Sequence, residues 1–357
     1  MIGVIGAGPA GSYFSSLMKE NVMLFEEHKE IGKPVACTGI MTPAIFDLTS
    51  LRKDVIVNTL DTVRVLGPHT STDIPLKEKE IVVDRARLDQ SLAEQALENG
   101  VIVKTEHKFV GNKKGHLFFN HKNNVIKYPY EVLVGADGPY STVARINTLS
   151  SKRAYWVAKQ YSVKVKTEPN VFTVFFGDVP DFFGWMVPES DSMARIGIAS
   201  KKHVAGHFDA LLKKLDISQK NLVECQAGPI PIYDPRARTS KENIYLLGDA
   251  AGHVKATTGG GIVYGMRGAR CLADSLKNGK DYEKTWRNEF GKELWFHLQI
   301  RKFLDKLSSK DYDQLISLLQ TTDLGKYNRD YPLQKLHLLM KPGLFFFALR
   351  NLLKNNL

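Results

Sequence analysis

The sequence lacks the features that mark secreted and membrane-spanning proteins. Its 357 residues include only three cysteines, Cys37, Cys225 and Cys271, which form neither a CxxC pair nor a disulfide framework. No run of 18 uncharged apolar residues is present, and no basic leader precedes the first predicted strand. We therefore expect a folded cytoplasmic protein that does not span a membrane.

Motifs of nucleic-acid-binding and metal-binding domains are also missing. The sequence has no zinc-finger spacing, RNA-recognition motif or basic-region helix. Lys and Arg number 49 against 38 Asp and Glu, which gives a formal net charge of +11. A solvated lysine-rich surface accounts for this excess, and so does contact with an anionic membrane or an acidic redox partner. We predict no metal site and no nucleic-acid partner.

A glycine-rich turn follows the first apolar run, residues 2–5, and precedes a helical pattern. In such a turn Gly6 permits the tight bend, and Gly8 lets a pyrophosphate approach the backbone. Gly11 allows helix and strand to pack closely, and Ala10 lies in the first turn of the helix. The helix N-terminus then faces the phosphates. This order of elements predicts a site for an adenosine diphosphate group.

A carboxylate stands where such a site needs one. The second apolar run, residues 22–25, ends at Glu26, about 20 residues past the first glycine, where an acid that binds the ribose is expected. No second GxGxxG unit follows a strand midway through the chain. A separate domain for a nicotinamide cofactor is therefore not predicted.

A second signature lies near residue 250. The apolar run 244–247 ends in Gly248-Asp249, where a carboxylate at a strand end is placed to accept hydrogen bonds from a polyol such as a ribityl chain. Gly259, Gly260 and Gly261 let the backbone approach a flat ring before a helix begins near Ile262. Together the two signatures predict binding of flavin adenine dinucleotide (FAD).

The chain alternates between helical and strand patterns in a way that predicts discontinuous domains. We expect an α/β fold with a Rossmann-like FAD-binding domain of the GR2 type, an inserted antiparallel sheet domain for the substrate, and C-terminal helices. The FAD-binding domain is assigned to 1–60, 81–150 and 236–285, the sheet domain to 61–80 and 151–235, and the helical region to 286–357.

Several motifs in this order resemble the para-hydroxybenzoate-hydroxylase-like flavoproteins, and within them the geranylgeranyl reductase family. The superfamily signals are the glycine turn 6–11, Asp84-Arg85, the segment 136–141 and Gly248-Asp249. The closer signals are the segments 31–39, 184–188 and 254–261 and a helical C-terminal extension. The resemblance covers essentially the whole chain, and it implies an FAD-dependent reductase of isoprenoid double bonds, such as those of archaeal-type ether phospholipids.

The resemblance assigns cofactor roles to individual positions. It implies that Arg85 reaches the pyrophosphate or ribityl region, that Asp137 and Gly138 buttress the cofactor, and that Asp249 binds the ribityl hydroxyls. A surface cation at a helix start remains an alternative for Arg85, and a turn cap remains one for Asp137. The glycines 259–261 and the helix after them would stabilise negative charge on the reduced flavin.

Catalytic and substrate roles rest on the loop beside the flavin and on the sheet domain. Cys37 is the leading proton donor and a cofactor contact, with a small buried side chain as the alternative. Trp185 is expected to face the flavin and, with Pro188, to grip an apolar chain. Five phenylalanines would suit a tunnel for a long isoprenoid tail, and Phe175 is assigned to the substrate site: Phe172, Phe175, Phe176, Phe182 and Phe183. Ordinary sheet core is the alternative for each of these residues.

Partners and competing functions complete the expectations. The electron donor is external: ferredoxin, a reduced deazaflavin or NAD(P)H. The apolar and basic segment 336–354 is expected either to lie on the inner face of the cell membrane beside a prenylated lipid substrate or to pack as a structural cap. A flavin monooxygenase is the competing enzyme. A non-catalytic prenyl-lipid carrier, resembling GDP-dissociation inhibitors, is the competing binding protein.

Overall fold

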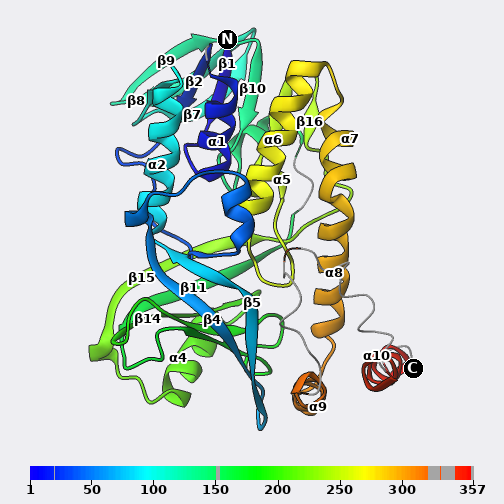
Figure 1. The fold of residues 1–357 in the computed structure, drawn as a ribbon. Helices are drawn as coiled ribbons and strands as arrows, with labels where there is room; N and C mark the ends of the chain where they lie inside the picture. Colours follow the sequence, from blue (N-terminus) through cyan, green and yellow to red (C-terminus); the bar gives the residue numbers. More distant parts are fainter. Residues whose placement is uncertain (20, 150–152, 321–329, 331–341, 355–357) are drawn as a thin grey trace.

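The computed structural model describes residues 1–19, 21–149, 153–320, 330 and 342–354. Two large sheets lie at opposite ends of the molecule, and helices α6, α7 and α8 run along one side of both (Figure 1). Helix α10 lies at the edge of the molecule, at the end far from the N-terminus. Among the described residues, no helix has the length and apolar character needed to cross a membrane.

The first sheet contains the N-terminal strand and is almost entirely parallel. Its six strands run in the order β16 (Ser240–Lys241), β17 (Ile244–Leu246), β10 (Val132–Gly135), β1 (Ile2–Ile5), β2 (Val22–Phe25) and β6 (Ile102–Lys104). Only the β16–β17 pair is antiparallel. The central strands are short apolar runs because helices and other elements cover both faces of the sheet. The carboxyl ends of β1, β2, β10 and β17 therefore share one edge.

Three helices frame this edge of the parallel sheet. Helix α1 (Pro9–Met18) contacts both α2 (Arg85–Glu98) and α6 (Ile262–Asn278). The short helices α3 (Thr142–Ile146) and α5 (Gly248–Ala251) follow β10 and β17. Every βα turn at this edge thus directs a helix N-terminus toward the same region, which is the usual ligand position in such sheets.

The second sheet has eight strands and is mainly antiparallel. Its order is β15 (Leu222–Pro231), β11 (Tyr155–Lys164), β14 (Met193–Ser200), β13 (Gly184–Pro188), β12 (Val171–Phe175), β4 (Ile56–Leu66), β5 (Ser71–Val83) and β3 (Ile40–Met41). Strands β12 and β4 are parallel. Helix α4 (Val204–Lys214) packs on one face of the sheet, through the stacked rings of Phe208 and Tyr161. The β4–β5 hairpin extends over 56–83, beyond the segment 61–80 expected from the sequence.

A small third sheet extends the N-terminal end. It consists of β7 (Lys108–Lys113), β8 (His116–His121) and β9 (Asn124–Pro129), and Phe119 of β8 stacks on Phe25 of β2 with ring centroids 4.2 Å apart. The C-terminal part of the chain is helical in the described residues: α7 (Tyr282–Trp286), α8 (Lys292–Leu304), α9 (Ser309–Gln320) and α10 (Pro342–Lys354). Proline at the start of α10 suits a helix N-terminus, where its missing N–H has no intrahelical partner.

Candidate functional site

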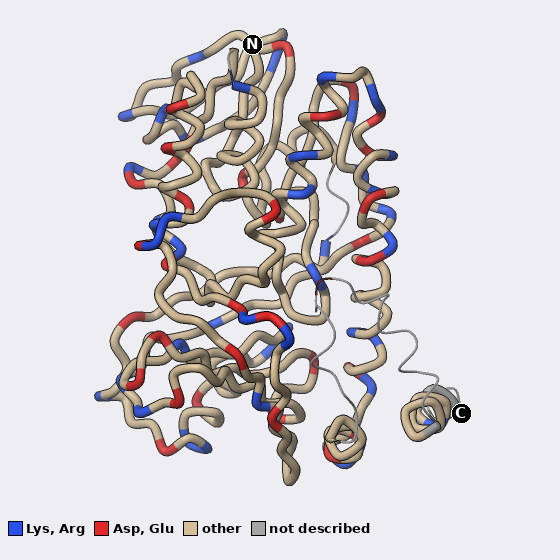
Figure 2. Tube along the Cα trace, viewed as in Figure 1, with Lys and Arg blue, Asp and Glu red and all other residues tan. Residues whose placement is uncertain are grey.

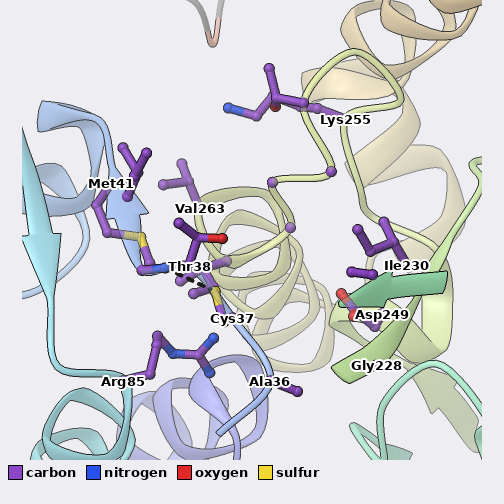
Figure 3. A pocket seen from close by; sticks show the side chains of 18 of the residues that line it. Ala36, Cys37, Thr38, Met41, Arg85, Gly228, Ile230, Asp249, Lys255 and Val263 are labelled. Carbon is purple, nitrogen blue, oxygen red and sulfur yellow. Dashed lines mark hydrogen bonds between the residues drawn. The ribbon is translucent and has the colours of Figure 1, made fainter. Parts of the chain in front are cut away.

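A cavity of about 560 Å³ is lined by residues of both large sheets. One group of lining residues comes from the turns at the carboxyl edge of the parallel sheet and from the N-terminal ends of α2 and α6: Gly8, Ala10, Gly138, Asp249, Arg85 and Gly259 to Ile262. A second group is apolar and comes from the antiparallel sheet: Val63, Val65, Phe172, Val174, Phe176 and Trp185. The segment 36–42 also lines the cavity, and Figure 3 shows Cys37 and Thr38 of this segment beside Arg85. This volume is within the range of small-molecule and cofactor sites.

The glycine turn after β1 has the shape that a phosphate site requires. Gly6 has a φ of +99°, and a side chain there would meet the Ala136 carbonyl oxygen at 2.4 Å. A side chain at Gly11 would lie 2.1 Å from the Gly6 carbonyl oxygen. At Gly8, by contrast, no atom lies within 4 Å of the added carbon, so the backbone borders open space. The first and third glycines therefore allow close packing, while the middle one leaves room for a ligand.

Glu26 lies beside this turn but does not line the cavity. One carboxylate oxygen accepts a hydrogen bond from the Ala7 N–H at 3.0 Å, and the other accepts one from the His28 N–H at 3.0 Å. The carboxylate thus ties the end of β2 to the glycine turn. The oxygen that accepts from the His28 N–H also lies 2.6 Å from His28 Nδ1, whereas the oxygen that accepts from Ala7 has a further lone pair for a ribose hydroxyl.

Asp249 is the buried carboxylate whose environment points most directly to a ligand. It lies at the N-terminus of α5 and lines the cavity, and its carboxylate accepts no hydrogen bond from the residues that the structure describes. Burial raises the pKa of Asp249, while the positive charges of Arg85 and Arg153 oppose that rise. Because a buried carboxylate without donors is costly, this arrangement fits a ligand that brings hydroxyl groups to it.

Asp137 has a different environment from Asp249. Its geometry is that of a turn cap, which was the alternative role considered in the sequence analysis. Its carboxylate accepts hydrogen bonds from Ser141 Oγ at 2.6 Å, Thr142 N at 2.7 Å and Val143 N at 3.0 Å. These donors belong to the start of α3. Gly138 lines the cavity and Asp137 does not, so any support that Asp137 gives to a cofactor is indirect.

Arg85 lies inside the cavity rather than on the surface. It is the first residue of α2, and its guanidinium pairs with Asp89 at 3.0 Å, one turn along the same helix. Burial opposes charge on this side chain, but Asp89 and the Cys37 sulfur raise the pKa of Arg85 above its ordinary value. Asp89 also lines the cavity, although the sequence analysis did not identify it. Its spacing of four residues from Arg85 on a predicted helix was the available signal.

Cys37 is the one cysteine of the three that lines the cavity. Its sulfur accepts a hydrogen bond from the Gly39 N–H at 3.3 Å, and the side chain is half-buried. Cys225 is exposed, whereas Cys271 is buried and donates to Glu289 at 2.9 Å. A wholly buried packing role, the alternative left open for Cys37, does not describe this position.

The aromatic wall includes Trp185 but excludes Phe175 and Pro188, two residues that the sequence analysis placed against the substrate. Successive side chains of a strand point to opposite faces of a sheet. Phe172 and Val174 line the cavity from β12, whereas Phe175 points to the other face, where Lys214 Nζ of α4 lies 5.9 Å from its ring centroid. The same alternation separates Trp185 from Pro188 on β13. We therefore assign the wall to Trp185, Phe172, Val174 and Phe176.

The loop before α6 completes the site. Gly259 has a φ of +70°, and Gly261 precedes the helix that begins at Ile262. A side chain on Gly261 would lie 2.8 Å from the Asp249 carboxylate, so glycine allows the loop to approach this acid. Lys255 also lines the cavity and forms a buried ion pair with Asp330. Figure 3 shows Lys255 on this loop, on the other side of the cavity from Arg85.

Comparisons with known proteins show similarity along nearly the whole chain. It is 28% identical over 360 residues to a digeranylgeranylglycerophospholipid reductase of Methanothrix thermoacetophila, covering 90% of this chain and 92% of the relative. It is 27% identical over 371 residues to digeranylgeranylglycerophospholipid reductase 2 of Methanothermobacter thermautotrophicus, covering 93% and 96%. No family model matches the chain.

Solved structures share the fold. A geranylgeranyl bacteriochlorophyll reductase-like protein from Thermoplasma acidophilum superposes with a TM-score of 0.86 at 20% identity, covering 97% of each chain. A flavoprotein/dehydrogenase from Cytophaga hutchinsonii superposes with a TM-score of 0.71 at 16% identity, covering 99% of each chain. The predicted fold class, a Rossmann-like flavoprotein fold with an added antiparallel sheet and C-terminal helices, is confirmed.

Proposed function

We propose that this chain, which is similar throughout its length to digeranylgeranylglycerophospholipid reductases, is an FAD-dependent reductase that saturates the double bonds of geranylgeranyl chains on ether phospholipids. The single observation that carries the proposal is the composition of the cavity. Dinucleotide-type turns form one part of its lining and an apolar aromatic wall forms another. A flavin and a long apolar chain would therefore meet inside one cavity.

The residues present fit FAD. The glycine turn and the N-terminus of α1 would hold the pyrophosphate, and Arg85 adds a buried positive charge on the same side. Asp249 would accept hydrogen bonds from ribityl hydroxyls. Gly259 to Gly261 and the N-terminus of α6 would offer backbone N–H groups and a positive helix end to the ring. When bound, FAD supplies a hydride for the reduction of an alkene.

The antiparallel sheet would bind and orient the prenyl chain. Phe172, Val174, Phe176 and Trp185 form an apolar surface along the cavity, and burial of an isoprenoid chain there stabilises the complex by about 25 cal/mol per Å² of apolar area removed from water. The wall also excludes water from the reacting carbons. Its contribution to catalysis is thus positioning and desolvation.

Cys37 is the proposed proton donor to the second alkene carbon. It is the only thiol on the cavity wall, and the Gly39 N–H fixes the position of its sulfur. A compact thiol is able to exchange protons with solvent between turnovers. We expect a Cys37→Ala protein to retain FAD and to lose most of its turnover. A variant that bound FAD and kept full turnover would remove Cys37 from the mechanism.

The electrons would come from an external donor: ferredoxin, a reduced deazaflavin or NAD(P)H. This proposal rests on the lack of a second nucleotide-binding turn in the sequence and on the net positive charge. Figure 2 shows Lys and Arg distributed over both halves of the molecule, with Asp and Glu among them. The positive net charge would favour association with an acidic donor, and the mixed distribution of charges along the chain singles out no docking face.

Helix α10 is the proposed contact with the membrane that holds the lipid. Phe345, Phe346 and Leu349 are 48%, 65% and 41% exposed, whereas Phe347 is buried. Arg350, on the next turn, pairs with Asp311 at 2.9 Å and stays half exposed. An exposed apolar helix face with basic neighbours suits the interface of an anionic bilayer. Residues 336–341 of the expected membrane segment lie outside the described residues.

A flavin monooxygenase is the competing enzyme, because the same type of fold would permit reduced flavin to react with oxygen. A prenyl-lipid carrier is the competing binding protein. The carboxylate of Asp249, which lines the cavity and accepts no hydrogen bond from the described residues, argues against a carrier, since a protein without a cofactor gains nothing from it. The similarity to named reductases over nine tenths of the chain favours reduction over hydroxylation.

A variant that fills the apolar part of the cavity tests this assignment. Val174→Trp places a ring between Trp185 and Val65, its neighbours across the sheet. We expect FAD affinity to stay within about threefold of wild type while prenyl-lipid reduction falls by at least tenfold. Gln95→Met, on α2 outside the cavity, serves as the control. Unchanged prenyl-lipid reduction in Val174→Trp would contradict the proposed substrate path.

A further inference from the structure

One buried amide connects the two residues proposed for catalysis. Gln160 on β11 is 5% exposed and lines the cavity. Its Oε1 accepts hydrogen bonds from Thr38 Oγ1 at 2.8 Å and from Trp185 Nε1 at 3.1 Å. Its Nε2 donates to the Cys37 carbonyl oxygen at 3.2 Å and to Gln226 Oε1 at 2.6 Å. All four residues that form these hydrogen bonds with Gln160 also line the cavity.

The chemistry of the partners fixes the orientation of this amide. The indole N–H of Trp185 is only a donor, so it requires the oxygen of Gln160. The Cys37 carbonyl is only an acceptor, so it requires the nitrogen. A flipped amide would lose both bonds at once. Gln160 therefore has a single orientation in which it holds the indole and the cysteine loop together.

The strand register explains how side chains on separate strands reach one another. Gln160 on β11 and Trp185 on β13 are both paired with Gly197 of the strand between them, β14. A side chain on Gly197 would lie 2.5 Å from Gln160 Cβ and 2.6 Å from Trp185 Cζ2. Glycine at this position therefore lets the indole cross β14 and reach the amide. On the other side, Gln226 of β15 is paired directly with Gln160.

A second side chain of β14 holds the same loop. Arg195 lies two residues before Gly197, and its NH1 donates to the Thr38 carbonyl oxygen at 2.6 Å. Arg195 is itself paired with Glu189 at 2.6 Å. The loop is thus bound at the Thr38 carbonyl by Arg195, and at the Cys37 carbonyl and the Thr38 hydroxyl by Gln160. Neither Gln160 nor Arg195 was identified from the sequence.

We propose that Gln160 is a positioning residue that fixes the Cys37–Gly39 loop and the Trp185 indole relative to one another on the cavity wall. The proposal rests on the proposed function for the catalytic meaning of the two partners. The contacts themselves do not depend on it. If hydride and proton must arrive at the two carbons of one double bond, the donor loop and the wall that orients the chain need a fixed separation. A displacement of about 1 Å at such a site lowers turnover by on the order of 100-fold.

The first test measures the loop without any substrate. In a Cys225→Ala background the remaining thiols are Cys37 and Cys271, and burial together with the Glu289 carboxylate raises the pKa of Cys271 and keeps it unreactive. We expect Gln160→Met to raise the rate of maleimide labelling of Cys37 by at least about tenfold, because the loop loses two of its bonds. Gln95→Met is the matched control, since the Gln95 amide is hydrogen-bonded to Thr49 and Ser50 and none of these residues lines the cavity. Equal labelling rates in the two variants would overturn the proposal.

The second test measures turnover with reduced FAD and a geranylgeranyl lipid under anaerobic conditions. We expect Gln160→Met to lose on the order of 10- to 100-fold in kcat with FAD affinity and KM within about threefold of wild type. A KM effect alone, with kcat unchanged, would contradict a positioning role. If the wild-type protein reduced no prenyl lipid, the proposed function would fail. The labelling rates would still decide whether Gln160 holds the Cys37–Gly39 loop in place.

A third test uses two variants, each of which removes one hydrogen bond to Gln160. The proposal therefore stays testable if Gln160→Met does not fold. Thr38→Val deletes the hydroxyl donor, and Trp185→Phe deletes the indole donor while keeping an aromatic ring. If both act through Gln160, their effects on Cys37 labelling are coupled, and the double variant departs from the product of the singles by at least about threefold. Strictly multiplicative effects would overturn the proposal.

Discussion

Replacing Asp249 by alanine should move cofactor affinity and apoprotein stability in different directions. The carboxylate is buried, its pKa is raised by that burial, and it accepts no hydrogen bond from the described residues. Hydrogen bonds from ligand hydroxyls to a charged group contribute about 1.5–3 kcal/mol, so their loss should weaken FAD binding roughly 10- to 150-fold. The apoprotein loses no internal hydrogen bond and sheds a desolvated charge, so its free energy of unfolding should stay the same or rise by about 1 kcal/mol.

The pH dependence of stability follows from the same carboxylate. Because the folded-state pKa of Asp249 is raised above the ordinary value of about 4, its contribution to stability is present below that pH and is lost as pH rises through the raised pKa. The apoprotein of Asp249→Ala should not show this loss of stability as pH rises. Urea unfolding of both apoproteins between pH 4 and pH 7, at about unit steps, measures the difference.

Asp137→Ala provides the matched control, because Asp137 is a buried acid beside the same cofactor turns. Its carboxylate accepts three protein hydrogen bonds, so its removal should lower apoprotein stability by about 1–3 kcal/mol. FAD titration by flavin fluorescence and urea unfolding give the two numbers for each variant. If Asp249→Ala destabilised the apoprotein as Asp137→Ala does, or left FAD affinity unchanged, our reading of Asp249 as a ligand-binding acid would be refuted.

Three further predictions concern the rest of the molecule. Lys255→Met leaves the Asp330 carboxylate buried without its ammonium partner, and urea unfolding should show a loss of about 3–5 kcal/mol; a loss under about 1 kcal/mol would argue against a strong pair. Burial lowers the pKa of His253 to about 3, so its contribution to stability is present above about pH 6.5 and falls by up to about 1.4 kcal/mol per pH unit as pH drops toward 3; His253→Leu should flatten this part of the unfolding profile, and an unchanged profile would assign the dependence elsewhere. Phe346→Ser should reduce flotation with anionic vesicles, whereas the equally exposed Val125→Ser on β9 should not; equal flotation of both would exclude α10 as the contact.

The parts of the site that depend on local backbone were predictable from the sequence. A glycine turn between an apolar run and a helix, and an acid followed by three glycines, specify their own geometry within a few residues. Gly6, Gly8, Gly11 and Asp249 accordingly occupy the backbone positions expected of them. Fold class followed from the same signals, because βα turns of this type occur at the edge of a parallel sheet.

The antiparallel sheet was harder to interpret because its central strands are apolar on both faces. Residues 171–176 contain no alternation of polar and apolar side chains, so the sequence did not indicate which face carries the cavity. The sequence therefore offered Phe172, Phe175 and Phe176 alike for the substrate wall, and the structure places Phe172 and Phe176 there but not Phe175. A shift of one residue along the strand moves each side chain from the cavity face of the sheet to the opposite face.

Contacts between distant segments had no signal in the sequence. Gln160 meets Trp185 only because both pair with Gly197 on the strand between them. No spacing of residues along the chain encodes this strand register. Lys255 and Asp330 are 75 residues apart in the chain and form a buried ion pair. Such pairs depend on tertiary structure, which is why sequence reasoning missed Gln160 and the Lys255–Asp330 pair although it identified Cys37, Arg85 and Asp249.

The central claim is that the cavity brings reduced FAD and an isoprenoid double bond together, and an anaerobic single turnover tests it most directly. Reduced enzyme is mixed with a geranylgeranyl ether phospholipid while the flavin absorbance is followed and the lipid mass is measured. Our account predicts that the flavin is reoxidised without oxygen and that one double bond is saturated for each equivalent of FAD. A flavin that stays reduced until oxygen is admitted, with a hydroxylated product or none, would contradict it.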